Sequence, residues 1–105
     1  MLKIYDVMLD VMRELRPTLE AIAARDPNLA DQMRRALQSV VLNTAEGMGS
    51  RGRNRQVRYH SALGSMREVR ACVDIGEVMG YGVSVTAEAG ARFDQVIGTL
   101  VKLAR

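Results

Sequence analysis

The chain has 105 residues, of which 48% are hydrophobic and 4% aromatic, and its 15 basic and 12 acidic side chains give a net charge of +3. This length predicts a single domain, residues 1–105, with a core of modest size. Few aromatic residues and seven Met favour packed helices over sheets, so we expect an all-α fold. The single Cys excludes an internal disulfide and favours a reducing compartment.

The first expected helix covers about residues 2–25. Apolar residues recur there at alternating intervals of three and four, which is typical of a packed helix, at positions 5, 8, 12, 15, 19 and 22. A second stripe lies beside it, at Ile4, Val7, Val11 and Thr18. This apolar arc is wider than one helix-packing face requires, so we expect the helix to contact something beyond its own bundle.

Two further features of this first segment carry predictions. Pro17 lies inside the pattern and should bend the helix, and the alternative is that the helix stops near Leu15 and restarts. Asp6 and Asp10 are incompatible with the apolar region of a signal peptide or with a membrane span. We therefore expect a soluble, cytoplasmic protein without a membrane partner.

Three more helices are expected, at about residues 28–48, 53–79 and 84–104. Asp26 or Asn28 is a suitable N-cap for the second, and Ser84 for the fourth. Glycines that reach the left-handed conformation should end the second and third helices, at positions 47, 49, 52, 80 and 82. Four helices joined by short connections predict an up-down-up-down antiparallel four-helix bundle, with the corner near residue 50 at the end opposite the other two.

Positive charge gathers in the middle of the chain. Residues 34–70 hold eight arginines against two glutamates. Four arginines follow the glycine-rich break directly: Arg51, Arg53, Arg55 and Arg58. Because positive charge is unfavourable at a helix N-terminus, intrinsic helix stability does not explain this run.

Guanidinium groups bind phosphate in a bidentate manner, so the arginine run predicts a nucleic-acid-binding patch. We expect support from Arg34, Arg35 and Arg67, and hydrogen bonds or base stacking from Gln56, Tyr59 and His60. The alternative is a solvated helix start with some intersubunit salt bridges.

Evidence for catalysis or a cofactor is weak. His60 is the only histidine, so a di-iron centre with two Glu-x-x-His pairs is excluded and a metal site is improbable. The spacing of Gly47, Gly49 and Gly52 matches a dinucleotide-binding fingerprint, but it follows a helix where that fingerprint requires a strand. Glu46 is expected to pair with an arginine. We therefore expect no enzyme activity, no cofactor and no metal.

Several motifs resemble the four-helix-bundle family of 23S rRNA intervening-sequence proteins, which more distantly includes the accessory variability proteins of diversity-generating retroelements. The matching segments are residues 39–47, 51–55, 62–65, 68–70 and 80–81, together with Tyr59. Within them, Asn43, Glu46 and Gly47 match the family's Asn-x-Ala-Glu-Gly motif, and Arg51, Arg53, Arg55 and Tyr59 match its basic helix start.

The resemblance implies a cytoplasmic, bacterial or phage-borne bundle that assembles as a homo-pentameric ring. For the retroelement branch it implies binding to nucleic acid and to a reverse transcriptase. Two functions follow as hypotheses. The first is a non-enzymatic oligomer that binds RNA or DNA, and the alternative is an adaptor for an acidic protein partner such as a retroelement reverse transcriptase.

Overall fold

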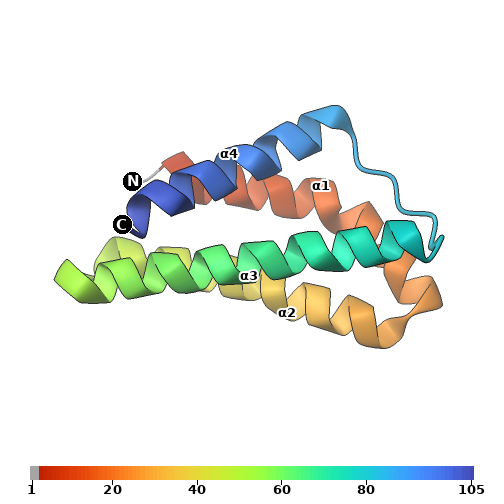
Figure 1. Cartoon of the computed structure of the whole chain (residues 1–105), viewed down its shortest axis with the longest axis horizontal. Coiled ribbons are helices and arrows are strands. Elements are labelled where there is room, and N and C mark those ends of the chain that lie inside the picture. The colour runs from red at the N-terminus through yellow and green to blue at the C-terminus, as the bar shows by residue number, and fades with distance from the viewer. Residues whose placement is uncertain (1–2) are drawn as a thin grey trace.

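The computed structural model describes residues 3–105, and this part of the chain is all-helical, with four helices and no strand (Figure 1). The helices are α1 (Lys3–Arg25), α2 (Pro27–Gly49), α3 (Gly52–Val78) and α4 (Ala87–Leu103). Each helix packs against the next in the chain, and α4 also packs against α1. The four therefore enclose one core in a body of 43 × 26 × 18 Å.

The core is formed by the apolar residues that recur at helical spacing, as predicted. Buried Leu, Val, Ile, Met and Ala side chains fill it, with Tyr59 and Phe93 as its aromatic members. The second stripe on α1 also faces inward, because Ile4, Val11 and Thr18 are all buried. Met12 and Leu19 of the first stripe remain half-exposed and line a groove between α1 and α2, so the expectation that this arc contacts something beyond the bundle stays a prediction.

α1 runs through Pro17 without interruption, so the helix does not stop and restart. Asp26 is the N-cap of α2, and its Oδ1 accepts a 3.0 Å hydrogen bond from the backbone N–H of Leu29. Pro27 occupies the first turn, where its missing N–H costs nothing.

The glycines have two different roles. Gly80, at φ 73°, closes α3 in a Schellman motif, in which the N–H of Tyr81 donates to the carbonyl of Gly76. Positive φ angles are found only at Gly52, Gly80 and Gly82 within residues 3–105. The expected left-handed conformation at Gly47 and Gly49 was wrong, since both complete α2 as helical residues.

The fourth helix starts three residues later than expected. Its N-cap is Thr86, whose Oγ1 accepts from the N–H of Ala89 at 3.1 Å, and Ser84 lies in the preceding loop. Val83 and Val85 pack against the core from this loop. Their burial holds residues 83–85 extended across the bundle, so the nearer capping residue begins the helix.

The two ends of the bundle differ (Figure 1). At one end the α1–α2 and α3–α4 connections meet, and the Tyr81 hydroxyl donates to Asp26 Oδ2 at 3.2 Å. At the other end the α2–α3 corner extends past the described ends of α1 and α4. The arginine run lies on this projecting corner.

Candidate nucleic-acid interface

The basic corner, defined here as residues 50–58, is a tight reversal between α2 and α3. Ser50 caps α2, with its N–H donating to the carbonyl of Gly47 at 3.2 Å and its hydroxyl donating to the carbonyl of Glu46 at 2.7 Å. Gly52 then takes φ 60°, which side-chain-bearing residues rarely adopt. α3 therefore begins within three residues of the end of α2.

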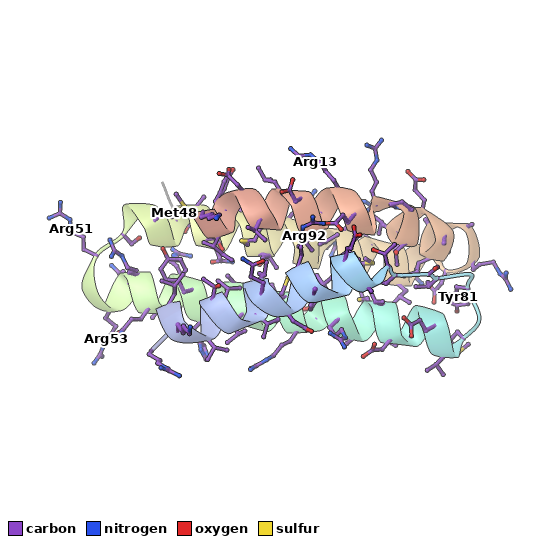
Figure 2. The ribbon with its side chains drawn as sticks, turned by 90° about the horizontal axis from the view of Figure 1, so that it is seen from above. Arg13, Met48, Arg51, Arg53, Tyr81 and Arg92 are labelled. Atoms are coloured by element: carbon purple, nitrogen blue, oxygen red, sulfur yellow. The ribbon has the colours of Figure 1, made fainter. Side chains whose placement is uncertain are left out.

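Arg51 and Arg53 project from this corner into solvent (Figure 2). Neither forms an ion pair within residues 3–105. Arg55 donates from Nε to the carbonyl of Ser50 at 3.0 Å, and it too has no carboxylate within ion-pair distance in that part of the chain. Three guanidinium groups are thus exposed and not neutralised by the protein's own described carboxylates.

Arg58 differs from the other three. Its Nε lies 2.9 Å from Glu46 Oε2, and both side chains are about half exposed, at 48% and 54%. The expected pairing of Glu46 with an arginine is confirmed. This ion pair bridges α2 and α3 at the base of the basic corner.

The start of α3 has the electrostatics of an open anion site. Its N-cap is Arg51, which makes no side-chain capping bond, and its first turn contains no acidic residue. The unpaired N–H groups and the positive end of the helix dipole therefore point outward with nothing negative to satisfy them in the described chain.

The other predicted arginines lie away from this corner. Arg34 and Arg35 both pair with Asp31, at 2.9 and 3.0 Å. They lie near the opposite end of α2, about 22 Å from Gly49 at 1.5 Å of rise per residue. Arg67 is exposed further along α3, about 18 Å from Arg55 by the same measure. The structure does not bring these three side chains together with the arginine run.

Beneath the basic corner, the motif residues join α2 to α3. Gly47 lies directly against Tyr59: a Cβ atom on Gly47 would lie 2.8 Å from Tyr59 Cε1. Asn43 donates from Nδ2 to the carbonyl of Ser39 at 2.9 Å, and the hydroxyls of Ser39 and Ser65 lie 2.7 Å apart across the two helices. The i, i+4 spacing of Ser39 and Asn43 is the only signal of this polar link in the sequence.

Tyr59 is a core residue. Its side chain is 1% exposed, so the expectation that it stacks on bases was wrong. Burial raises the pKa of the Tyr59 hydroxyl, and the nearby charge of Arg55 lowers it by a smaller amount. His60 and Gln56 are exposed, and the Gln56 amide donates to the backbone carbonyl of Arg105.

Within residues 3–105 no group of three or more His, Cys, Asp or Glu side chains is arranged to hold a metal ion. None of the four helices is long and apolar enough to cross a membrane.

Cys72 is buried, and burial together with the charge of Glu68 raises the pKa of its thiol.

A family model described as 23S rRNA-intervening sequence protein matches residues 2–101 of the chain. No curated protein and no solved structure matches the chain. The family match spans all four helices except the last two residues of α4, and it includes the basic corner.

Proposed function

The chain belongs to the family of 23S rRNA-intervening sequence proteins, and on that premise we propose that it is a non-enzymatic, homo-oligomeric protein that binds the phosphates of RNA or DNA through its basic corner. The observation that carries the proposal is the exposure of Arg51, Arg53 and Arg55, which have no carboxylate partner within residues 3–105, on a corner that extends past the neighbouring helices. Arg51 and Arg53 keep all their guanidinium donors available for phosphate oxygens, and Arg55 keeps its two terminal amino groups, because its Nε donates to the carbonyl of Ser50.

The contact is expected to be to the phosphate backbone. Tyr59 is buried and the residues of the basic corner include no aromatic side chain, so the exposed imidazole of His60, two residues past the corner, is the nearest predicted ring for base stacking. Guanidinium groups and backbone N–H groups at the start of α3 both recognise phosphate, which carries no sequence information. We therefore expect binding that depends on shape and charge more than on sequence.

The proposal predicts how strongly the affinity for nucleic acid should depend on salt concentration. Three neutralised phosphates per protomer predict a slope of log K against log salt of about −2.7 on duplex DNA, or roughly a 40-fold loss of affinity between 50 and 200 mM salt. If copies of the chain assemble, for example as the ring of five that we expect from its family resemblance, several corners can bind one nucleic acid and avidity multiplies a weak contact.

The test is a titration of fluorescently labelled structured RNA, single-stranded RNA and duplex DNA at rising salt. The double variant Arg51→Ala/Arg53→Ala should weaken binding at least tenfold at 100 mM salt and reduce the salt slope by about 1.8. The matched control Arg35→Ala/Arg67→Ala removes the same charge from positions away from the basic corner and should change both quantities much less.

Two results would contradict the proposal. One is an equal loss of affinity in the two double variants, because general charge would then explain the binding. The other is the absence of salt-dependent binding to all three nucleic acids. In that case, a single acidic protein recovered from nuclease-treated lysate by the wild-type chain, and lost with Arg51→Ala/Arg53→Ala, would support the adaptor hypothesis.

A further inference from the structure

Ion pairs divide the basic side chains of this bundle into two groups. Seven of the 15 are arginines paired with carboxylates, and they are spread over all four helices. The other eight have no carboxylate within ion-pair distance in residues 3–105. All eight are exposed, and six of them lie at the end of the bundle that carries the basic corner: Lys3, Arg51, Arg53, Arg55, Lys102 and Arg105. Unpaired positive charge is therefore concentrated on one end of the molecule.

These six cations form two rows on opposite sides of this end. The corner row, between α2 and α3, consists of Arg51, Arg53 and Arg55. The α1–α4 row consists of three residues at the start of α1 and the end of α4: Lys3, Lys102 and Arg105. Because α2 packs against α1 and α3 against α4, the rows lie side by side, about 8–10 Å apart, which is one helix-packing distance. The hydrogen bond from the Gln56 amide to the carbonyl of Arg105 holds the end of α4 against the start of α3.

Helix stability does not explain both rows. Lys3 lies at the N-terminus of α1, as the corner row does at that of α3, and the helix dipole disfavours cations at both places. The dipole of α4 favours only Lys102 and Arg105. Among the described carboxylate side chains near this end, Asp6 is exposed and unpaired, and Glu46 is already in an ion pair. The end therefore keeps an excess of positive charge.

We infer that the ligand of this end is a double-stranded nucleic acid, with one row of cations on each of its two backbones. In a duplex, two phosphate backbones border each groove, about 6 Å apart across the minor groove and about 12 Å apart across the major groove of B-DNA. The spacing of the two rows lies between these widths, and lysine and arginine side chains are long enough to cover the difference. A single strand has only one backbone and can be held by one row at a time.

The aromatic residues favour a duplex for an independent reason. Proteins that hold single strands stack successive bases on exposed rings. Here Tyr59 and Phe93 are buried, and Tyr5 and Tyr81 are only half-exposed. His60 is then the only exposed ring within residues 3–105, and one imidazole cannot stack successive bases. A duplex needs no such rings from the protein, because its bases are already stacked on one another.

This inference rests on phosphate binding at the basic corner, which is the proposed function, and adds the α1–α4 row and the duplex. The corner row alone predicts a slope of log K against log salt of about −2.7 on duplex DNA, and the two rows together predict about −5.4. On a single strand, where one row acts, the expected slope is about −2.1. Between 50 and 200 mM salt, the affinity should therefore fall roughly 2,000-fold for the duplex and roughly 20-fold for the single strand.

The experiment is a salt titration with three fluorescently labelled probes of nearly equal charge. Two are an RNA duplex and a DNA duplex of about 16 base pairs, and the third is an oligouridylate of twice that number of nucleotides. At 100 mM salt the wild type should bind at least one of the duplexes more than about tenfold more tightly than oligouridylate. The ratio between the two duplexes then reports whether the rows fit the A-form or the B-form backbone better.

The decisive variant is Lys102→Gln/Arg105→Gln, which removes two charges from the α1–α4 row and leaves the basic corner intact. It should weaken duplex binding at least about tenfold, reduce the salt slope by about 1.8 and change oligouridylate binding less than about threefold. The matched control is Arg25→Gln/Arg67→Gln, because these arginines are also unpaired within residues 3–105 but lie outside both rows. The control should keep the preference for the duplex. Circular dichroism should report wild-type helix content for both variants, since all four side chains are exposed.

Two results would overturn the inference while leaving phosphate binding at the basic corner in place. One is binding of oligouridylate that is as tight as, or tighter than, binding of both duplexes. The other is an unchanged duplex slope in Lys102→Gln/Arg105→Gln when Arg51→Ala/Arg53→Ala lowers that slope. A protein that binds none of the three probes would overturn this inference and the proposed function together.

Discussion

Gly47 of α2 and Tyr59 of α3 are in such close contact that no side chain fits between them. A Cβ atom added to Gly47 would lie 2.8 and 2.9 Å from two carbons of the Tyr59 ring, closer than real Cβ atoms approach. Tyr59 is itself 1% exposed, so the ring has little room to move. The glycine of the Ala-Glu-Gly segment is therefore required by packing, and the contact fixes α3 against α2 just beneath the basic corner.

Gly47→Ala should destabilise the protein by about 1–3 kcal/mol, because the new methyl group displaces a buried ring. Gly98→Ala is the matched control: Gly98 lies in an exposed part of α4, and a Cβ atom there meets no atom within 4 Å. That change should stabilise the protein by about 0.5–1 kcal/mol. Urea unfolding of both variants measures the contrast, and equal effects would contradict the packing explanation.

Asp26→Ala should cost about 1 kcal/mol, because it removes the N-cap of α2. It also removes the acceptor for the Tyr81 hydroxyl, which links the α3–α4 connection to the α1–α2 corner. Tyr81→Phe removes this second bond only and should cost less than Asp26→Ala. Asp10→Ala, which breaks an exposed pair with Arg13, is the control and should change the free energy of unfolding by less than about 0.5 kcal/mol.

Glu46→Gln should strengthen nucleic-acid binding while barely changing stability. The half-exposed pair with Arg58 contributes at most about 1 kcal/mol, since solvent screens it. Its loss frees a fourth guanidinium group at the basic corner, so the salt slope should steepen by about 0.9. Asp31→Asn frees Arg34 and Arg35 near the other end of α2 and should leave binding unchanged. Unchanged affinity in Glu46→Gln would mean that Arg58 does not contact the nucleic acid.

Stability should fall at high pH because of Tyr59. Burial raises the pKa of its hydroxyl above the ordinary value of about 10. The folded state therefore retains a proton that the unfolded state has lost. Its contribution to stability is complete below about pH 10 and is lost as the pH rises from there through the folded-state pKa.

Tyr59→Phe is the variant that checks this pH dependence. It should change stability at pH 7 by less than about 1 kcal/mol and should reduce the alkaline decline seen in urea unfolding between pH 9 and 11. Tyr81, whose pKa is also raised, first by burial and then by Asp26, accounts for a remaining decline. An identical decline in wild type and Tyr59→Phe would contradict the assignment.

The sequence predicted the helices well, because apolar spacing and short polar breaks report on local structure directly. It did less well where two helices meet. A glycine in a sequence can indicate either a helix end or a place where two helices pack closely, and nothing near Gly47 distinguishes the two. The left-handed conformation was therefore predicted for Gly47, which is in fact helical and packs against Tyr59. Ser is a somewhat better N-cap residue than Thr, so capping preference favours Ser84, and the packing of Val83 and Val85 explains why Thr86 caps the helix instead.

The density of arginines along the sequence did not predict which of them lie close together in space at the candidate interface. It grouped Arg34 and Arg35 with the arginine run, although most of the length of α2 separates them. It also named Tyr59 among the residues that could stack on bases, although Tyr59 shares its face of α3 with the core residues Ala62 and Leu63. Where a residue lies along and around its helix, and which carboxylate is near it, depends on the fold.

The projection of the α2–α3 corner beyond the other two helices also has a dynamic consequence. The backbone amides in the first turn of α3 can exchange their hydrogens with water when this turn frays locally, while the core remains packed. A polyanion resting there would slow that exchange at these few amides and nowhere else, so the ligand's footprint could be mapped one peptide group at a time.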